Sequence, residues 1–408
     1  MPQSQFKIKR HKQVYQPSTK RRFSIWRIIG GVLLMSVLFF VGYSIADPVM
    51  SFVTGEMKLR IDEQKNQSSQ AVSDTPSDAP SSEPEPTKGE TVGFDQIKAA
   101  FMPYTVLADD ERFEEFIASA KKLGLNTAVI EVMDASGVLY YNSSLAESQE
   151  IGAVMEDSPE LDERIQALSA EGIGTIAKLD AFSNPLAARK IKGAAARYSK
   201  DITTMWLDNY ATEGGKPWIS PESIEGTAYV SALAGEIAAS GAHYVMISSL
   251  HYPKGVALNL AYFGPKSNDS RLSVLSQYIT QLRDQLAPTG CELIVSYNAS
   301  DYLTKSDLVF GGGPSQLSAE NIAPVILPSA FDKGITIGKT VITDSAAQSG
   351  ELTDAFMEYL LDSVGSDTRI LPVLAYTAED GGEAQINAIK RYALSQYILY
   401  SGNGRYDS

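Results

Sequence analysis

Two carboxylates stand at the ends of consecutive predicted strands, and their positions suit chemistry that needs a pair of acids. Asp134 ends the predicted strand 126–134, and Asp180 ends the predicted strand 173–180. In a parallel sheet these ends lie at one edge, where the catalytic side chains of many α/β enzymes gather. Two facing carboxylates can serve as nucleophile and general acid–base. The alternative is that Asp134 and Asp180 only cap loops or orient the backbone.

Other catalytic constellations are poorly represented. Ser248 and Ser249 precede His251, but side chains on one strand rarely form a nucleophile–base pair, and no G-x-S-x-G motif is present. Outside the N-terminal tail, His243 and His251 stand at opposite ends of one predicted strand, which argues against a shared metal. The glycines 311–313 lack the Lys-Ser/Thr of a phosphate-binding loop. We therefore expect no metal and no cofactor.

The charge distribution excludes further classes of protein. The 408 residues include 35 Lys and Arg against 49 Asp and Glu, and a single Cys makes an intramolecular disulfide impossible. Residues 1–27 contain eight basic side chains and no acidic one, so the rest of the chain is more acidic than the net charge of −14 suggests. Such a surface argues against a nucleic-acid partner.

The segment 28–46 predicts a single transmembrane helix. Its 19 residues are apolar and carry no charge, close to the roughly 20 that a helix needs to cross a bilayer. The basic tail 1–27 should then remain in the cytoplasm, and the rest of the chain should lie outside. A cleaved signal peptide is the alternative, since Ser44-Ile45-Ala46 resembles a cleavage site. The apolar run exceeds the roughly 7–15 residues usual in signal peptides, which favours a retained anchor.

Residues 47–94 predict an extracytoplasmic linker. Positions 66–90 are rich in Ser, Pro and acidic residues with almost nothing apolar. Such a segment cannot bury enough surface to offset the entropy lost on ordering, so we expect it to be disordered.

Residues 95–408 predict an α/β domain, because apolar strand patterns alternate with amphipathic helices. The near-continuous apolar runs are typical of parallel strands buried on both faces. Eight strand–helix units favour a (β/α)8 TIM barrel, with a doubly wound sheet as the alternative. The predicted strands are 98–106, 126–134, 173–180, 243–250, 291–298, 321–329, 369–377 and 396–402.

Six ordered segments of this domain resemble a bacterial family of glycoside-hydrolase-like barrels related to the amylase-type barrels. They are NTAVIEVMDASG (126–137), EGIGTIAKLDAFSNPLA (171–187), HYVMISSLHYPKG (243–255), IAPVILPSAFDKG (322–334), TRILPVLAYT (368–377) and AQINAIKRYALSQYILYSGNGRY (384–406). The resemblance implies a TIM barrel over 95–408 that acts on polysaccharide, here a cell-wall or extracellular glycan.

The chain departs from that family where catalysis would occur. Ser248 stands where the family carries an acidic residue, and Asn298 replaces the acid that ends the fifth strand. His251 replaces an arginine, and Tyr400 stands in place of a tryptophan. Retaining glycoside hydrolysis needs two carboxylates roughly 5–5.5 Å apart. The resemblance therefore implies a membrane-anchored barrel with weak or lost hydrolysis, in which Asp134 and Asp180 are a substitute pair. A non-catalytic glycan-binding or envelope-scaffolding protein is the alternative.

Seven residues are candidates for ligand binding. Aromatic rings near the predicted rim can stack on sugars, and polar groups there can bond their hydroxyls. The alternative is that these rings only pack loops. The candidates are Trp206, Trp218, Ser248, His251, Tyr252, Asn298 and Tyr400.

The charge bias around 28–46 makes a testable prediction about topology. Protease added to intact cells should degrade the barrel and leave the tail 1–27 protected, as seen by antibodies against each end. Lysed cells are the control, in which both ends should be cut. Protection of the barrel in intact cells would contradict this topology.

Overall fold

The structure, a computed structural model, describes residues 92–265, 270–304, 307–331 and 334–406. The chain divides into two units, Met1–Ser82 and Glu83–Ser408, and all described residues belong to the second. The predicted cytoplasmic tail, transmembrane helix and all but the last residues of the linker lie outside the described ranges. Within those ranges, no helix has the length and apolar character needed to cross a bilayer.

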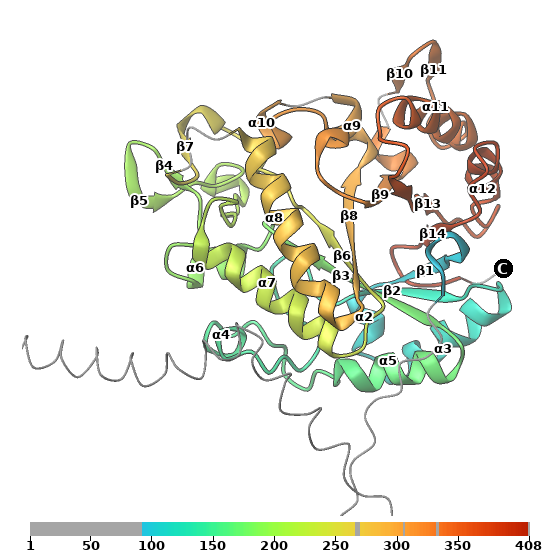
Figure 1. Ribbon diagram of the computed structural model, residues 1–408, viewed down its shortest axis with the longest axis horizontal. Coiled ribbons are helices and arrows are strands. Elements are labelled where there is room, and N and C mark those ends of the chain that lie inside the picture. Colours follow the sequence, from blue (N-terminus) through green and yellow to red (C-terminus); the bar gives the residue numbers. More distant parts are fainter. Residues whose placement is uncertain (1–91, 266–269, 305–306, 332–333, 407–408) are drawn as a thin grey trace, which may run out of the picture. The chain divides into compact units, whose positions relative to one another are not determined.

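Eight parallel strands close into a barrel (Figure 1). Each strand pairs in parallel with its neighbours, and the last strand pairs with the first. The predicted TIM barrel is thereby confirmed, and the doubly wound alternative is wrong. The strands are β1 (Lys98–Met102), β2 (Thr127–Glu131), β3 (Gly174–Asp180), β6 (Tyr244–Ser248), β8 (Glu292–Asn298), β9 (Asn321–Ile326), β13 (Val373–Ala375) and β14 (Tyr397–Tyr400).

Helices between the strands cover the barrel. Several begin at polar caps: the Asp109 carboxylate accepts from the backbone N–H of Arg112, and Ser223 and Ser270 cap two later helices in the same way. The longer helices are α3 (Asp110–Lys122), α5 (Leu161–Ala170), α7 (Ile224–Ala239), α8 (Arg271–Leu286), α11 (Ser349–Leu361) and α12 (Glu383–Lys390). The shorter ones are α2 (Tyr104–Leu107), α4 (Ala146–Glu150), α6 (Pro185–Lys190), α9 (Ala299–Thr304) and α10 (Asp307–Phe310).

Two small antiparallel sheets and several helices were not anticipated from the sequence. One sheet contains β4 (Arg197–Tyr198), β5 (Asp201–Met205) and β7 (Ala261–Tyr262), and the other is the hairpin of β10 (Ile335–Ile337) and β11 (Thr340–Ile342). The unanticipated helices are α11 and the short α2, α4, α6, α9 and α10. The strands of both sheets are short and largely exposed, so they lack the apolar runs that identify the barrel strands.

Prolines shorten three of the predicted strands, since proline has no N–H to donate to a sheet. The predicted strand 98–106 ends at Met102, because Pro103 begins the turn into α2. The predicted strand 321–329 ends at Ile326, before the 3₁₀ turn that starts at Pro328. Pro372 divides the predicted strand 369–377 into β12 (Arg369–Ile370) and β13.

Alternation along each strand sorts the apolar side chains into two cores. Inward positions such as Val129, Ile176 and Met246 form one cluster inside the barrel, together with Phe94 from the short 3₁₀ turn η2 (Phe94–Gln96). Phe94 was assigned to the linker from the sequence, but it packs edge-on against Tyr244 at the base of the barrel.

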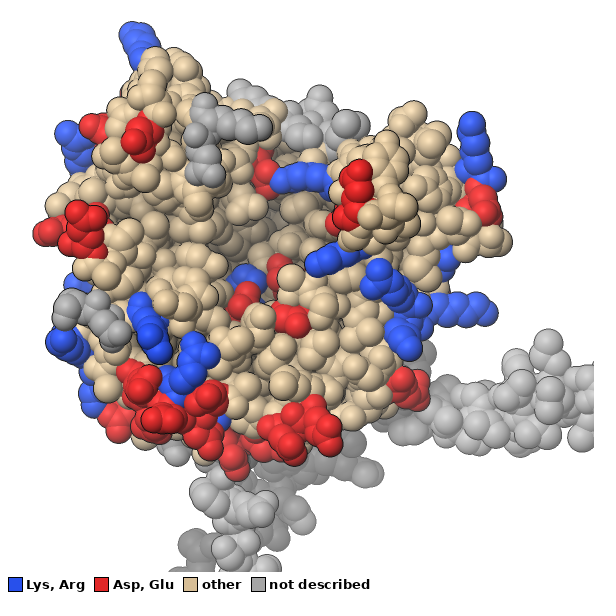
Figure 2. Space-filling model, turned by 180° about the vertical axis from the view of Figure 1, so that it is seen from behind, with Lys and Arg blue, Asp and Glu red and all other residues tan. Residues whose placement is uncertain are grey.

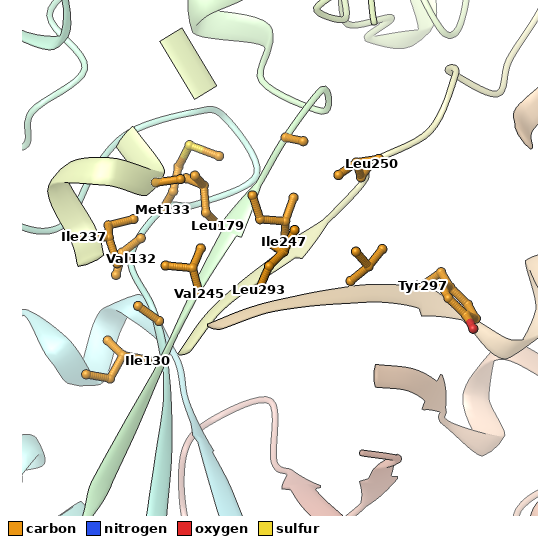
Figure 3. Close-up of a cluster of buried hydrophobic side chains, with 14 of the residues drawn as sticks. Ile130, Val132, Met133, Leu179, Ile237, Val245, Ile247, Leu250, Leu293 and Tyr297 are labelled. Atoms are coloured by element: carbon orange, nitrogen blue, oxygen red, sulfur yellow. The ribbon is translucent and has the colours of Figure 1, made fainter. Parts of the chain in front are cut away.

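Outward positions form a second, larger cluster between the strands and the helices. Figure 3 shows part of this layer, where Leu179 and Val245 from neighbouring strands stand beside Ile237 of α7. Both faces of the barrel strands are therefore buried, which explains why their sequences are apolar almost without interruption.

Tyr406 connects the first and last strands of the barrel. Its hydroxyl accepts from the backbone N–H groups of Phe101 and Ser401, at 2.9 and 3.2 Å, and lies 2.8 and 2.9 Å from the carbonyls of Phe101 and Leu399. The side chain is buried. The hydroxyl therefore satisfies backbone groups on both sides of the closure between β1 and β14.

Tyr406→Phe should lower the free energy of unfolding by about 1–3 kcal/mol, because it leaves buried backbone N–H groups without an acceptor. Chemical denaturation of the purified full chain would measure the change. Tyr210→Phe is the matched control, since Tyr210 is exposed and should change stability by no more than about 0.5 kcal/mol. Equal stabilities of the two variants would contradict a role for Tyr406 in closure.

Candidate functional site

The inward positions of the barrel change from apolar to polar toward the carboxyl ends of the strands. On β2 the inward residue after Val129 is Glu131, and on β3 Ile176 is followed inward by Lys178 and Asp180. The strand register places Glu131 beside Lys178 and Asp180 beside Ser248. Charged and hydroxyl side chains therefore cover the apolar interior at the carboxyl ends of these strands.

These side chains line a cavity of about 290 Å³, which we call the rim pocket. Figure 2 shows a face of the molecule that is hollowed between two lobes, with acidic and basic side chains together near its middle. The polar residues that line the rim pocket are Glu131, Lys178, Asp180, Ser248, Ser249, His251, Ser296, Tyr297, Asn298, Asp301 and Tyr400.

Lys178 lies between two carboxylates in the rim pocket. Its Nζ is 3.2 Å from Oε1 of Glu131 and 3.2 Å from Oδ2 of Asp180. Burial by itself disfavours the ammonium, but attraction to Asp180 and Glu131 outweighs burial and raises the pKa of Lys178. Lys178 is therefore a fixed positive charge at neutral pH.

Asp180 is held as an anion by three donors. Besides Lys178, the hydroxyls of Ser248 and Ser249 donate to its Oδ1, at 2.5 and 2.9 Å. Burial acts to raise the pKa of Asp180, but the ammonium and the two hydroxyls together lower it. Ser249 has a backbone φ of 53°, an unusual value for a residue other than glycine, which turns the chain out of β6 at this point.

Asp134, the other predicted member of the carboxylate pair, is engaged within its own loop. Its Oδ1 accepts from the backbone N–H groups of Ser136 and Val138, at 2.8 and 3.0 Å, and from the Ser136 hydroxyl at 2.6 Å. The loop turns back at Gly137, where φ is 94° and a Cβ would collide with Asn184. Asp134 is not among the residues that line the rim pocket, so the structure does not bring it together with Asp180 there.

The seven predicted binding residues divide into two groups. Ser248, His251, Asn298 and Tyr400 line the rim pocket. Three others, Trp206, Trp218 and Tyr252, bond to groups of the protein and do not line it.

Each of these three aromatic side chains supports a loop. Trp206 is fully buried and donates to the carbonyl of Val256. Trp218 donates to Asp208, and Tyr252 donates to Glu222.

His251 is a neutral, buried member of the rim pocket. Its Nδ1–H donates to the carbonyl of Tyr252 at 2.7 Å, and its ring packs against Trp218 and Phe310. Burial lowers the pKa of His251. The hydrogen bond to the Tyr252 carbonyl acts in the opposite direction, because it favours the charged imidazolium, but its effect is smaller. The imidazole therefore adds no charge to the pocket at neutral pH.

Lys178 was not identified from the sequence as a member of a site, whereas Tyr297 and Asp301 stand at the end of the predicted strand 291–298 and just after it, where rim residues are expected. Lys178 shares the inward face with Asp180 two positions later, a spacing that identifies the pair once strand β3 is recognised. Asp301 is bonded to the Lys254 ammonium, and Tyr297 stacks on Tyr302. Tyr297 belongs to β8, but its partner Tyr302 and the residue Asp301 lie in α9, so both contacts depend on how the segment after β8 folds back. In the described part of the chain, no three His, Cys, Asp or Glu side chains gather closely enough to hold a metal.

A second cavity adjoins the rim pocket. It measures about 700 Å³ and shares two lining residues, Leu327 and Tyr400, with the rim pocket. Tyr376 and Asp380 are among its other lining residues. The Tyr400 ring, which packs against Phe101 at 4.8 Å, therefore forms a wall common to both cavities.

Comparisons with known proteins agree with this architecture. A family described as "Putative glycosyl hydrolase domain" matches residues 99–406. No curated protein matches the sequence. The glycoside hydrolase domain of PgaB (BpsB) from Bordetella bronchiseptica is similar in structure, with a TM-score of 0.54 and 11% identity over 76% of this chain and 94% of that one. At this identity the likeness shows a common fold.

Two further solved structures match at lower TM-scores. A hypothetical protein from Ruminiclostridium thermocellum is 19% identical, with a TM-score of 0.43, over 48% of this chain and 96% of that one. The glycoside hydrolase domain of PelA from Pseudomonas aeruginosa is 10% identical, with a TM-score of 0.40, over 75% of this chain and 95% of that one.

Lys178→Met should lower the free energy of unfolding by about 3–5 kcal/mol near neutral pH, because it leaves two buried carboxylates without their counter-charge. The lowered pKa of Asp180 means that the wild-type ion pair stabilises the fold above about pH 4 and is lost in stronger acid. The raised pKa of Lys178 means that the pair persists until the pH rises past about 10.

Acid should weaken the wild-type ion pair but relieve the strain in Lys178→Met, since one of the variant's two facing carboxylates can take up a proton. The difference in unfolding free energy from wild type should therefore shrink as the pH falls below about 5. Lys339→Met removes an equal charge from an exposed turn and should have little effect at any pH. A loss of stability that does not change with pH would argue against the ion pair.

Proposed function

The chain belongs to the family of putative glycosyl hydrolase domains, and on that premise we propose that its barrel binds a cell-wall or extracellular glycan with weak or absent hydrolysis. The observation that carries the proposal is the rim pocket at the carboxyl ends of the strands, in which Lys178 bridges the two innermost carboxylates. Ligands of TIM barrels bind at this end, and concave sites with a few fixed polar groups favour small polar ligands.

The chemistry of the pocket supports binding over bond cleavage. A glycosidase needs one carboxylic acid that holds a proton and a second carboxylate that is free to act as nucleophile or base. The low pKa of Asp180 prevents it from donating a proton at neutral pH. Glu131 is not free to act as nucleophile or base, because its Oε1 is paired with the Lys178 ammonium. The serine and asparagine at positions 248 and 298 cannot replace a carboxylic acid, so general acid catalysis worth roughly 10²–10⁴-fold should be missing.

The proposed location is the outer side of the cell membrane. The apolar run 28–46 and the basic tail 1–27 support a single-pass anchor with the N-terminus in the cytoplasm. The acidic Ser/Pro segment 66–90 would then hold the barrel away from the membrane, within reach of extracellular glycan.

Residual hydrolysis is the competing proposal, and two pairs of acids are candidates for it. The predicted pair is Asp134 with Asp180. The geometry adds a second pair, Glu131 with Asp180. One oxygen of each carboxylate is 3.2 Å from the Lys178 ammonium, so these two oxygens lie at most twice that distance apart. That limit includes the roughly 5–5.5 Å typical of retaining enzymes, but a cation occupies the space between them.

A panel of cell-wall and extracellular glycans would test binding and cleavage together on the full chain. We expect binding, with reducing-end release at least about 10²-fold below that of an active amylase-type barrel assayed alongside. Tyr400→Ala should weaken binding about tenfold, because it removes the ring that walls both cavities.

Tyr210→Ala is the matched control, because that ring is exposed and lines neither cavity. Its binding should equal that of wild type. Measurable turnover would overturn the proposed loss of catalysis. Its disappearance in the single variant Asp180→Asn, and also in the single variant Asp134→Asn or Glu131→Gln, would identify the catalytic pair. A chain that binds nothing on the panel would overturn glycan recognition and favour envelope scaffolding.

A further inference from the structure

Asp301 carries a carboxylate oxygen with no hydrogen-bond donor. The residue lies in α9, just after β8, and lines the rim pocket with only 8% of its surface exposed. Oδ1 is paired with the ammonium of Lys254, while Oδ2 is buried and has no partner among the described residues. Burying an anionic oxygen without a donor is costly, so this atom is expected to meet one when the pocket is filled.

A second polar atom without a partner belongs to the same pocket wall. The hydroxyl of Tyr297 is buried and unbonded within the described ranges, and Tyr297 also lines the rim pocket. Its ring lies nearly parallel to that of Tyr302, with centroids 5.5 Å apart and an interplanar angle of 20°. The end of β8 and the following α9 therefore hold a hydroxyl and a carboxylate oxygen that no described residue satisfies.

Among the described residues, the formal charges of the pocket leave one negative charge uncompensated. Its three carboxylates are Glu131, Asp180 and Asp301, and the two ammonium groups that pair with them belong to Lys178 and Lys254. Buried His251 adds no charge, since its pKa is lowered. A partly enclosed cavity with an excess of negative charge attracts cations and disfavours anions.

We propose that the rim pocket selects sugar residues with a free amine, whose ammonium donates to Oδ2 of Asp301. This inference rests on the proposed glycan binding and names the class of glycan. A neutral sugar hydroxyl can donate to the same oxygen but leaves the excess negative charge of the pocket in place. An acidic sugar would increase that negative charge. The cavity of about 290 Å³ is near the lower end of the roughly 300–1,000 Å³ usual for ligand pockets, which suits one sugar ring.

Calorimetry on the full chain with three matched sugars tests the proposal. The probes are glucosamine, N-acetylglucosamine and glucose, each as a monosaccharide and as a β-1,4-linked trimer. We expect the free-amine form to bind about tenfold more tightly than the other two, because a charge-assisted hydrogen bond replaces a neutral one. The preference should weaken as salt is raised, since added ions screen the excess charge.

Two variants change the charge in opposite directions. Asp301→Asn should abolish the preference for the free amine and leave the affinity for N-acetylglucosamine nearly unchanged. Lys254→Gln removes a competing cation and should increase the preference for glucosamine. Asp367→Asn is the control, because Asp367 is exposed and precedes β12 at the opposite end of the barrel.

The outcomes separate this inference from the proposed function. Equal affinity for the three sugars, or a preference that persists in Asp301→Asn, would overturn amine selection while leaving glycan binding in place. A chain that binds none of these sugars and nothing on the wider glycan panel would overturn both.

Discussion

Closure of the sheet is the constraint on which the rest of this structure depends. Once β14 pairs with β1, every second residue of each strand must fit inside a ring of fixed size, and the residues between them must pack against helices. No barrel strand can then turn a polar face to solvent. The Tyr406 hydroxyl reinforces this closure by bonding the backbone on both sides of it. The long apolar runs, the covering helices and the inward polar layer all follow from that geometry.

The same alternation that builds the apolar interior also builds the site. Inward positions below the mouth are occupied by side chains such as Ile176 and Met246, and the next inward positions are Lys178 and Ser248. Removing a charged side chain from water is tolerable only if it has partners, and the bridge of Lys178 to Glu131 and Asp180 provides partners for all three. The arrangement that makes this layer stable also keeps Asp180 ionised, which makes it a poor proton donor. The stability of this layer and the poor proton donation of Asp180 thus have one physical cause.

Beyond the strand ends, loops decide which side chains reach the pocket. The loop after β2 folds back on Asp134 and uses that carboxylate to hold its own backbone. The segment after β8 instead brings Asp301 into the pocket wall and leaves one of its oxygens without a donor. Two acids at comparable distances from strand ends therefore have different environments. This difference supports a pocket suited to recognition, with ligand donors completing the hydrogen bonds that the protein leaves open.

The sequence by itself determined the barrel, because burial on both faces of its strands leaves a clear local pattern. The resemblance of the motifs singled out Ser248 and Asn298, and both line the pocket. Only the tertiary structure decided the roles of Asp134, Trp206 and Asp301. Loop residues have no periodicity, and their contacts join segments far apart in the chain, such as Lys254 with Asp301 and Trp206 with Val256. Such contacts depend on the packing of the whole barrel, which no local pattern encodes.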